Sequence, residues 1–106
     1  IVKRQRREEE LTVSKIQQVV CEHFKVPEEL LQTKTRKREI VQARQVAMYL
    51  SKNLTNDALS YIGRQLGKKD HATVVYACKV VADLMQTDRN FKLEVEEIQR
   101  KLYSGN

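Results

Sequence analysis

The sequence predicts an all-α fold, a small helical domain that contains a helix-turn-helix. Apolar residues recur every three or four positions along most of the 106-residue chain, as expected for amphipathic helices. The alternation of apolar and polar residues that is typical of strands is almost absent, and only one proline and three glycines interrupt the pattern. A glycine followed by two lysines, at residues 67–69, separates two of the helical segments. The length favours one compact domain.

Residues 1–11 are expected to be the end of a linker helix, and residues 12–106 are expected to form the folded domain. The first ten residues carry four basic side chains followed by three glutamates. This segment is too charged for a core and lacks the apolar face of a membrane helix. Because the chain begins with Ile1 rather than Met, we expect it to be an excised C-terminal domain.

Three helices are predicted before the glycine-centred turn. Thr12 is placed to cap the first, which the Val26-Pro27 pair ends, and Pro27 then starts a short helix through Leu31. A basic connector at residues 34–38 leads into a long helix from about Lys37 to Asn53. The inward-facing apolar residues of the first and the long helix are Val13, Ile16, Val20, Phe24, Ile40, Ala43, Ala47 and Leu50.

The helix-turn-helix is expected at about residues 57–86, with Thr55 to Asp57 capping its first helix. Its apolar row ends at Leu66, and Gly67 then supplies a residue that readily takes positive φ. Asp70 is placed to cap the second helix. The apolar stripe of that helix is Val74, Ala77, Cys78, Val81, Leu84 and Met85. A last helix is expected to begin at Asp88, with inward-facing residues Phe91, Val95, Ile98 and Leu102.

The start of the second helix of this motif carries exposed side chains suited to base edges. In a helix-turn-helix, this part of the second helix enters the major groove of DNA. The residues there are Asp70, His71, Ala72 and Thr73. Lys68 and Lys69, in the turn, are expected to face phosphates. The alternative is an ordinary helical hairpin with a solvated basic turn.

The charge of the whole chain supports an anionic partner. Twenty Lys and Arg residues against fourteen Asp and Glu residues give a formal net charge of +6, which suits nucleic acid or an anionic membrane surface. No run approaches the roughly 18 apolar residues of a membrane-spanning helix, and the charged N-terminus is unlike a secretory signal. We therefore expect a cytoplasmic protein.

Further basic residues have positions that suit a DNA duplex. Arg36 lies in the basic connector, which could enter a narrow minor groove, although a solvated charge run is the alternative. The polar residues that lie away from the apolar stripe of the long helix are Arg44, Gln45 and Lys52. Arg44 and Lys52 are eight residues apart and are expected to meet successive phosphates from one side of the helix. Glu39 and Asp57 could instead pair with them.

No enzyme activity and no metal site are predicted. His71 neighbours Asp70, but adjacent residues on a helix do not face one another, and no nucleophile is placed by spacing. The G-x-x-x-x-G-K-[ST] phosphate loop is absent, so this segment alone is not expected to hydrolyse nucleotides. Cys21 and Cys78 fall on apolar helix faces and are predicted to be buried thiols rather than a disulfide. With His23 and His71 they do not give the spacing of a zinc site.

Three stretches resemble one known family. They are Ile40-Val41-x-Ala43-Arg44-Gln45-x-Ala47-Met48-Tyr49-Leu50, Ile62-Gly63, and Gly67-x-x-Asp70-His71-x-Thr73-Val74. Together they resemble the C-terminal DNA-binding domain of DnaA, the bacterial chromosome replication initiator, over Leu11 to about Met85. The resemblance implies a Trp-repressor-like helix-turn-helix that binds DnaA boxes at the replication origin. It also implies a nucleoid-associated domain without a cofactor of its own, since ATP is expected only in the ATPase domain of the full-length initiator.

The resemblance also implies a role for individual residues. Those that match base-contacting positions are Asp70, His71, Ala72 and Thr73 in the major groove and Arg36 in the minor groove. Those that match positions on or near the phosphate backbone are Arg44, Gln45, Lys52, Thr55, Leu59 and Lys69, with Lys68 beside them in the turn. Lys68-Lys69 replaces the usual Gly-Arg, and Ala72 replaces the usual Thr. Ala72 cannot donate a hydrogen bond, but its methyl can still contact a thymine methyl.

Two alternatives to DNA binding remain open from the sequence, and the isolated domain is expected to be a monomer. An acidic phospholipid surface could bind the segment from Ile1 to Leu11, which however lacks an apolar face. A helical protein-docking module would need the last helix, from Phe91 to Leu102, to expose an apolar patch rather than pack it.

Overall fold

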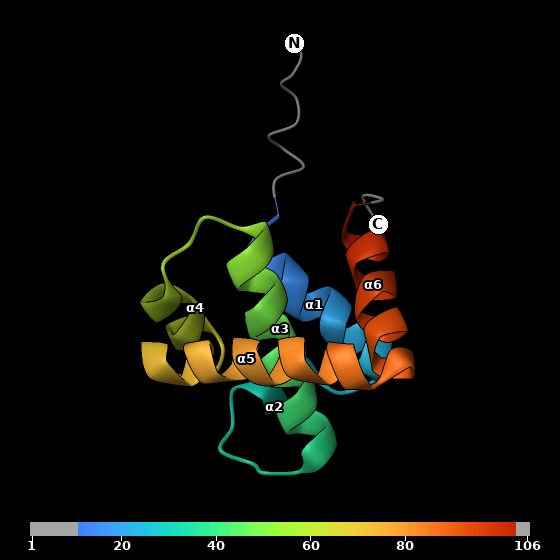
Figure 1. Cartoon of the computed structure of the whole chain (residues 1–106). Helices are drawn as coiled ribbons and strands as arrows, with labels where there is room; N and C mark the ends of the chain where they lie inside the picture. The colour runs from blue at the N-terminus through green and yellow to red at the C-terminus, as the bar shows by residue number, and fades with distance from the viewer. Residues whose placement is uncertain (1–10, 104–106) are drawn as a thin grey trace.

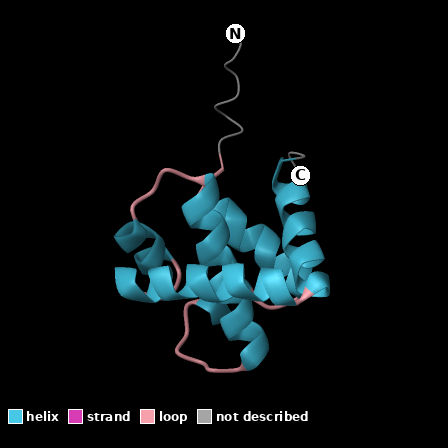
Figure 2. Cartoon of the chain, in the orientation of Figure 1, coloured by secondary structure: helices cyan, strands magenta, loops and turns pink. Residues whose placement is uncertain are grey.

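The computed structural model describes residues 11–103, and this range holds six helices and no strand. The predicted all-α fold is confirmed, as Figure 2 shows. The helices are α1 (Val13–Phe24), α2 (Glu28–Leu31), α3 (Arg38–Leu54), α4 (Leu59–Gln65), α5 (His71–Thr87) and α6 (Arg89–Tyr103). Residues 1–10, which carry most of the predicted linker helix and of the alternative phospholipid contact, lie outside the described residues. None of the described helices has the length and apolarity needed to cross a bilayer.

Helix α3 lies at the centre of the domain. It packs against α1 and α5 and also contacts α2 and α4, while α6 packs on α1 and α5. In Figure 1, α5 crosses α3, with α4 beside the start of α5 and α6 near its end. The fully buried large side chains come from all of these elements and are Ile16, Val20, Leu31, Val46, Met48, Leu50, Ile62, Leu66, Val74, Val81, Val95 and Ile98. One apolar core therefore holds every helix in place.

Side-chain caps set several helix ends as the sequence predicted. The hydroxyl of Thr12 accepts a hydrogen bond from the backbone N–H of Lys15 at 3.1 Å. A carboxylate oxygen of Asp88 accepts one from the N–H of Phe91 at 3.1 Å, so Asp88, the predicted first residue of the last helix, caps it, and Arg89 is the first helical residue. Such caps satisfy backbone N–H groups that have no partner within the helix. Pro27 differs slightly from the prediction, since it is the N-cap of α2 and Glu28 is the first helical residue.

The predicted cap of the helix-turn-helix is wrong. The N-cap of α4 is Ala58, which makes no side-chain cap hydrogen bond. Thr55 instead ends α3, where its hydroxyl donates to the carbonyl of Ser51 at 2.7 Å. The same hydroxyl oxygen accepts from the N–H of Asp57 at 3.2 Å. Thr55 thus closes the preceding helix rather than opening the next one.

The last helix packs its apolar face. Its four predicted inward-facing residues, Phe91, Val95, Ile98 and Leu102, are all buried. A docking module that exposes this face is therefore contradicted. The thiols of Cys21 and Cys78 are free, the first buried and the second half-buried, and burial raises the pKa of Cys21 to about 11.

Candidate nucleic-acid interface

A close approach of two backbones builds the turn of the helix-turn-helix. The N–H of Lys69 donates to the carbonyl of Gly63, in α4, at 2.8 Å. A Cβ at Gly63 would overlap the carbonyl oxygen of Lys69, so only glycine fits there without a shift of the turn. Gly67 takes the predicted positive φ, at 103°, and Lys68 follows with a φ of 59°. The left-handed pair reverses the chain between α4 and α5.

Asp70 caps α5, as predicted, and this sets the first turn of the helix. One oxygen of its carboxylate, Oδ1, accepts hydrogen bonds from the N–H of Thr73 at 2.9 Å and from the hydroxyl of Thr73 at 2.8 Å. Hydrogen bonds to the charged form, first the one from the Thr73 backbone, lower the pKa of Asp70. Asp70 is therefore an exposed carboxylate anion, and its second oxygen, Oδ2, has no hydrogen bond to another residue of the range 11–103.

The start of α5 is a solvent-facing polar surface. Asp70, His71, Ala72 and Thr73 are all exposed, whereas Val74, the next residue, is fully buried. The four predicted base-contacting residues of this helix are therefore brought together on one exposed turn. Because the hydroxyl of Thr73 donates to Asp70, its oxygen is left as an acceptor.

The connector between α2 and α3 presents Arg36 to solvent. Short side-chain hydrogen bonds shape this connector: the hydroxyl of Thr33 donates to the carbonyl of Leu30 at 2.7 Å and accepts from the N–H of Thr35 at 3.3 Å. The hydroxyl oxygen of Thr35 in turn accepts from the N–H of Lys37 at 3.3 Å. These local turns leave the Arg36 side chain exposed.

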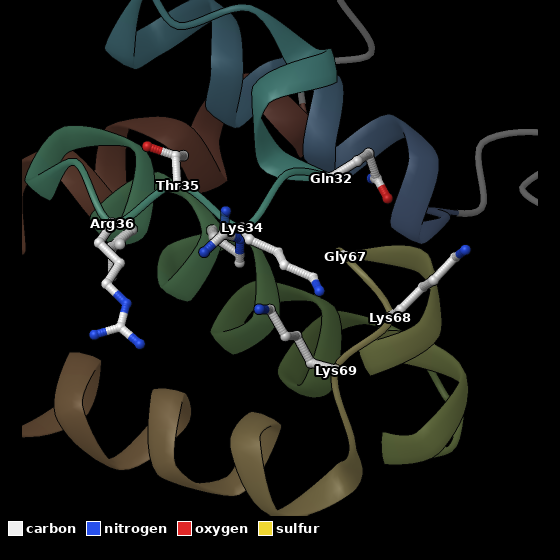
Figure 3. A pocket seen from close by; sticks show the side chains of 9 residues that line it. Gln32, Lys34, Thr35, Arg36, Gly67, Lys68 and Lys69 are labelled. Carbon is white, nitrogen blue, oxygen red and sulfur yellow. The ribbon is translucent and has the colours of Figure 1, made fainter.

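The connector and the helix-turn-helix turn line one basic hollow of about 670 Å³. Its lining residues are Gln32, Lys34, Thr35, Arg36, Val41, Arg44, Gly67, Lys68 and Lys69. In Figure 3, Lys34 and Lys69 extend toward the middle of the hollow, whereas Lys68 points away from it at the rim. Five of the nine residues are cationic and none is acidic, so the hollow attracts anions. The sequence analysis assigned the connector to the minor groove and the lysines of the turn to phosphates, but it did not predict that the two segments share a surface.

Arg44 is not the solvent-facing side chain that the sequence predicted. Only 6% of it is exposed. Its Nε donates to the carbonyl of Leu31 at 2.9 Å, and its Nη2 donates to the carbonyls of Thr33 at 2.9 Å and Leu30 at 3.5 Å. Burial lowers the pKa of Arg44. Its Nη1 has no hydrogen bond to another residue of the range 11–103, so a phosphate contact through Nη1 stays a prediction.

The other predicted phosphate-contacting residues are divided between exposed and half-buried positions. Lys52 is exposed on α3, and Gln45, Thr55 and Leu59 are half-buried. Leu59 packs against the core. Among the described residues, Lys79 forms an ion pair with Asp83, and the Nε2 of His23 lies 3.3 Å from a carboxylate oxygen of Glu94. The alternative pairing of Arg44 or Lys52 with Glu39 or Asp57 is therefore not formed.

A helix-turn-helix with an exposed, capped second helix and a basic hollow beside its turn defines the class of DNA-binding helix-turn-helix domains. The comparison with known sequences agrees. Residues 13–81 match the family described as the bacterial dnaA protein helix-turn-helix.

The matches to named relatives cover most of the chain. It is 50% identical over 92 residues to the chromosomal replication initiator protein DnaA of Bacteroides thetaiotaomicron, a match that covers 87% of the chain. It is 50% identical over 93 residues to that of Flavobacterium psychrophilum and 44% identical over 92 residues to that of Lactobacillus delbrueckii. The chain belongs to the bacterial DnaA helix-turn-helix family. It spans about a fifth of the length of these relatives, since each match covers 20% of the relative.

Proposed function

We propose that this domain binds a short duplex site of the DnaA-box class at a chromosomal replication origin, as part of a replication initiator. The observation that carries the proposal is the position of Arg36 on the same basic hollow as the turn that leads into α5. Arg36 and the turn that leads into α5 thereby lie on one side of the domain, which supports their assignment to adjacent minor and major grooves. We further propose that the isolated domain is a monomer in the cytoplasm, on the nucleoid, and that nucleotide control belongs to an ATPase domain elsewhere in the full-length protein.

Base recognition is assigned to the exposed first turn of α5 and to Arg36. The free oxygen of Asp70 can accept from an exocyclic amine of cytosine or adenine, and the methyl of Ala72 can contact a thymine methyl. His71 and Thr73 stand beside them on the same exposed turn. Arg36 is assigned to the adjacent minor groove, whose negative potential is strongest where A·T pairs narrow it.

Backbone contacts are assigned to residues around this exposed turn. They are Arg44 through Nη1, Gln45, Lys52, Thr55, Leu59, Lys68 and Lys69. Phosphate contacts fix the register of a protein on its site but carry little sequence information. The two groups of residues therefore predict different losses when they are replaced.

The proposal is tested with Lys52→Ala and His71→Ala on a box duplex and a scrambled duplex, by fluorescence anisotropy. Lys52→Ala should weaken both duplexes alike, because it removes a phosphate contact. His71→Ala should cost about 1–3 kcal/mol on the box duplex and little on the scrambled one. Lys92→Ala, an exposed lysine of α6, is the matched control and should change neither.

The ratio of the two affinities decides the outcome. If both variants keep the wild-type ratio of box to scrambled affinity, then α5 is not the recognition helix. If box and scrambled duplexes bind with equal affinity and acidic vesicles displace both, the phospholipid alternative takes the place of box recognition.

A further inference from the structure

The connector that carries Arg36 is tied to α3 and to the helix-turn-helix by contacts that no DNA-facing role requires. Arg44, in α3, donates to the backbone carbonyl of Leu31, and the side chain of Gln32 joins the connector to the end of α4. Gly67, in the turn, lies against the same carbonyl of Leu31. These three contacts converge from separate elements on the short stretch from Leu30 to Thr33.

Arg44 supplies the first and strongest of these contacts. Its guanidinium is buried without an acidic partner in the described part of the chain, and its protein hydrogen bonds go to the three carbonyls of Leu30, Leu31 and Thr33. A buried charge is costly unless hydrogen bonds satisfy it. The carbonyls lie at the C-terminal end of α2, where helix carbonyls lack partners and favour a cation. A four-residue helix has too few internal hydrogen bonds to stand alone, so Arg44 holds this end in place.

Gln32 and Gly67 join the same stretch to the helix-turn-helix. The Nε2 of Gln32 donates to the carbonyl of Gln65, in the last turn of α4, at 2.8 Å. A Cβ on Gly67 would lie 3.1 Å from the carbonyl oxygen of Leu31, which shows how closely the turn approaches the connector. That carbonyl is the one that Arg44 Nε binds. The end of α2, where the connector begins, and the turn therefore approach each other closely through backbone groups.

We propose that Arg44 and Gln32 are positioning residues that form a latch, in which Arg44 holds the Arg36 connector to α3 and Gln32 holds it to the helix-turn-helix, and that the latch thereby sets where Arg36 lies relative to the start of α5. The proposal rests on the proposed function, in which Arg36 and α5 read adjacent grooves. Arg36 and the start of α5 can bind adjacent grooves at the same time only if the distance between them matches the duplex. A connector that is already fixed in the free protein also loses less conformational entropy when it binds DNA. The family resemblance gives Arg44 a phosphate contact, whereas the latch gives it a role through Arg36.

The first test uses the domain without DNA. Gln32→Ala removes the bond to Gln65, and also a 3.1 Å bond to the Oε1 of Gln17 in α1. Gln17→Ala, which removes only the latter, is the matched control. We expect faster amide hydrogen exchange and lower ¹⁵N order parameters at residues 33–37 in Gln32→Ala, with unchanged helical circular dichroism, and wild-type values in Gln17→Ala. Unchanged mobility of residues 33–37 in a folded Gln32→Ala protein would overturn the latch.

The second test measures the preference of the domain for an A·T-rich over a G·C-substituted edge of the site, as the ratio of two dissociation constants. Gln32→Ala should lower this preference by about two- to tenfold, the equilibrium value of one hydrogen bond. Arg44→Lys keeps the charge but loses the planar fork that reaches several carbonyls, and it should lower the preference similarly. A phosphate-only role for Arg44 predicts that the lysine keeps the preference.

A double-mutant cycle with Arg36→Ala completes the test. If the latch acts through Arg36, Gln32→Ala changes nothing further in the Arg36→Ala background. An equal loss of preference in both backgrounds overturns the positioning role. If Arg36→Ala itself leaves the preference unchanged, the proposed minor-groove function of Arg36 fails, and the positioning role fails with it. The mobility of residues 33–37 then still shows whether the latch exists as a structural contact.

Discussion

Replacing Gly63 with alanine should destabilise the domain, although the same change in an exposed helix normally stabilises it. Gly63 lies within α4, where alanine is favoured over glycine by about 1 kcal/mol. Its added methyl, however, would overlap the carbonyl oxygen of Lys69 and lie 3.0 Å from the carbonyl carbon of Lys69 and 3.3 Å from the carbonyl oxygen of Asp70. These are backbone atoms of the turn, so they can move only if the turn moves.

The structure sets the expected size of the loss. Overpacking of this kind costs about 1–3 kcal/mol, and displacing the turn also weakens the 2.8 Å bond from Lys69 N–H to the Gly63 carbonyl, a further loss of about 0.5–1.5 kcal/mol. Against the helix-propensity gain, the net loss of unfolding free energy is about 1–3 kcal/mol. For a domain of this size, each lost kcal/mol lowers the melting temperature by about 4–8 °C.

Urea and thermal unfolding followed by circular dichroism measure this loss. Ser60→Ala is the matched control, since Ser60 is exposed in the same helix and its replacement should be neutral or slightly stabilising. Box affinity should also fall for Gly63→Ala at temperatures where it is folded, because the shifted turn carries the start of α5. A Gly63→Ala protein as stable as the wild type would show that the turn yields easily and that the close approach of the two backbones is not required.

Three further outcomes follow from the charges and caps of the interface. Box affinity should fall steeply with salt, with a slope of log K against log salt of roughly −4 to −5 if about five phosphates are neutralised, and a slope near zero contradicts the phosphate assignments. Asp70→Ala should lower the melting temperature at pH 7. Because the folded-state pKa of Asp70 lies below its ordinary value of 3.8, the difference from wild type should be constant above that value and shrink as the pH falls through the folded-state pKa; a difference that grows in acid contradicts the cap. Ala72→Thr costs at most about 0.7 kcal/mol of helix propensity and should leave the fold unchanged and box binding unchanged or tighter by anisotropy, and a tenfold loss would show that Ala72 packs too closely against the DNA.

The sequence predicted the elements whose signals are local. The long helix was expected from about Lys37 to Asn53 and runs from Arg38 to Leu54. It could be predicted because its apolar periodicity and its basic first residues depend only on residues close together in the sequence. The Asp70 cap and the positive φ of Gly67 are equally local, and both are confirmed. The cap at Thr55 was misassigned because a hydroxyl between two helices can serve either, and only the structure shows that it bonds back to Ser51.

The burial of Arg44 was missed although helical spacing indicates it, because Arg44 lies four residues after Ile40 and three residues before Ala47, and therefore beside the apolar stripe. Ile40, Ala43, Ala47 and Leu50 define one apolar stripe, and Arg44 was placed away from it. In the structure α1, α2, α4 and α5 all contact α3, so its buried surface is wider than that stripe. A weak signal existed, since Val46 and Met48 are apolar residues outside the predicted stripe and are both fully buried. Two of the carbonyls that receive Arg44 end α2, and the third, of Thr33, lies in a connector whose path no periodicity describes.

Lys68, where the chain departs from the family pattern, has a backbone conformation that favours glycine. The resemblance places glycine at this position, and the structure gives Lys68 a φ of 59°, in the left-handed region. A side chain in this region costs about 1–2 kcal/mol, whereas glycine loses about 0.5–1 kcal/mol more in backbone entropy on folding. Lys68→Gly should therefore raise stability slightly, by up to about 1 kcal/mol.

The same substitution removes a cation from the rim of the basic hollow. If Lys68 neutralises one phosphate, Lys68→Gly should weaken box and scrambled duplexes alike and make the salt slope shallower by about 0.9. Lys25 provides a matched control, because it ends α1 with the same φ of 59° and does not line the hollow. Lys25→Gly should give the same small gain in unfolding free energy and an unchanged salt slope. If both variants shift the slope equally, the change reflects only the net charge of the domain, and the phosphate contact assigned to Lys68 is wrong.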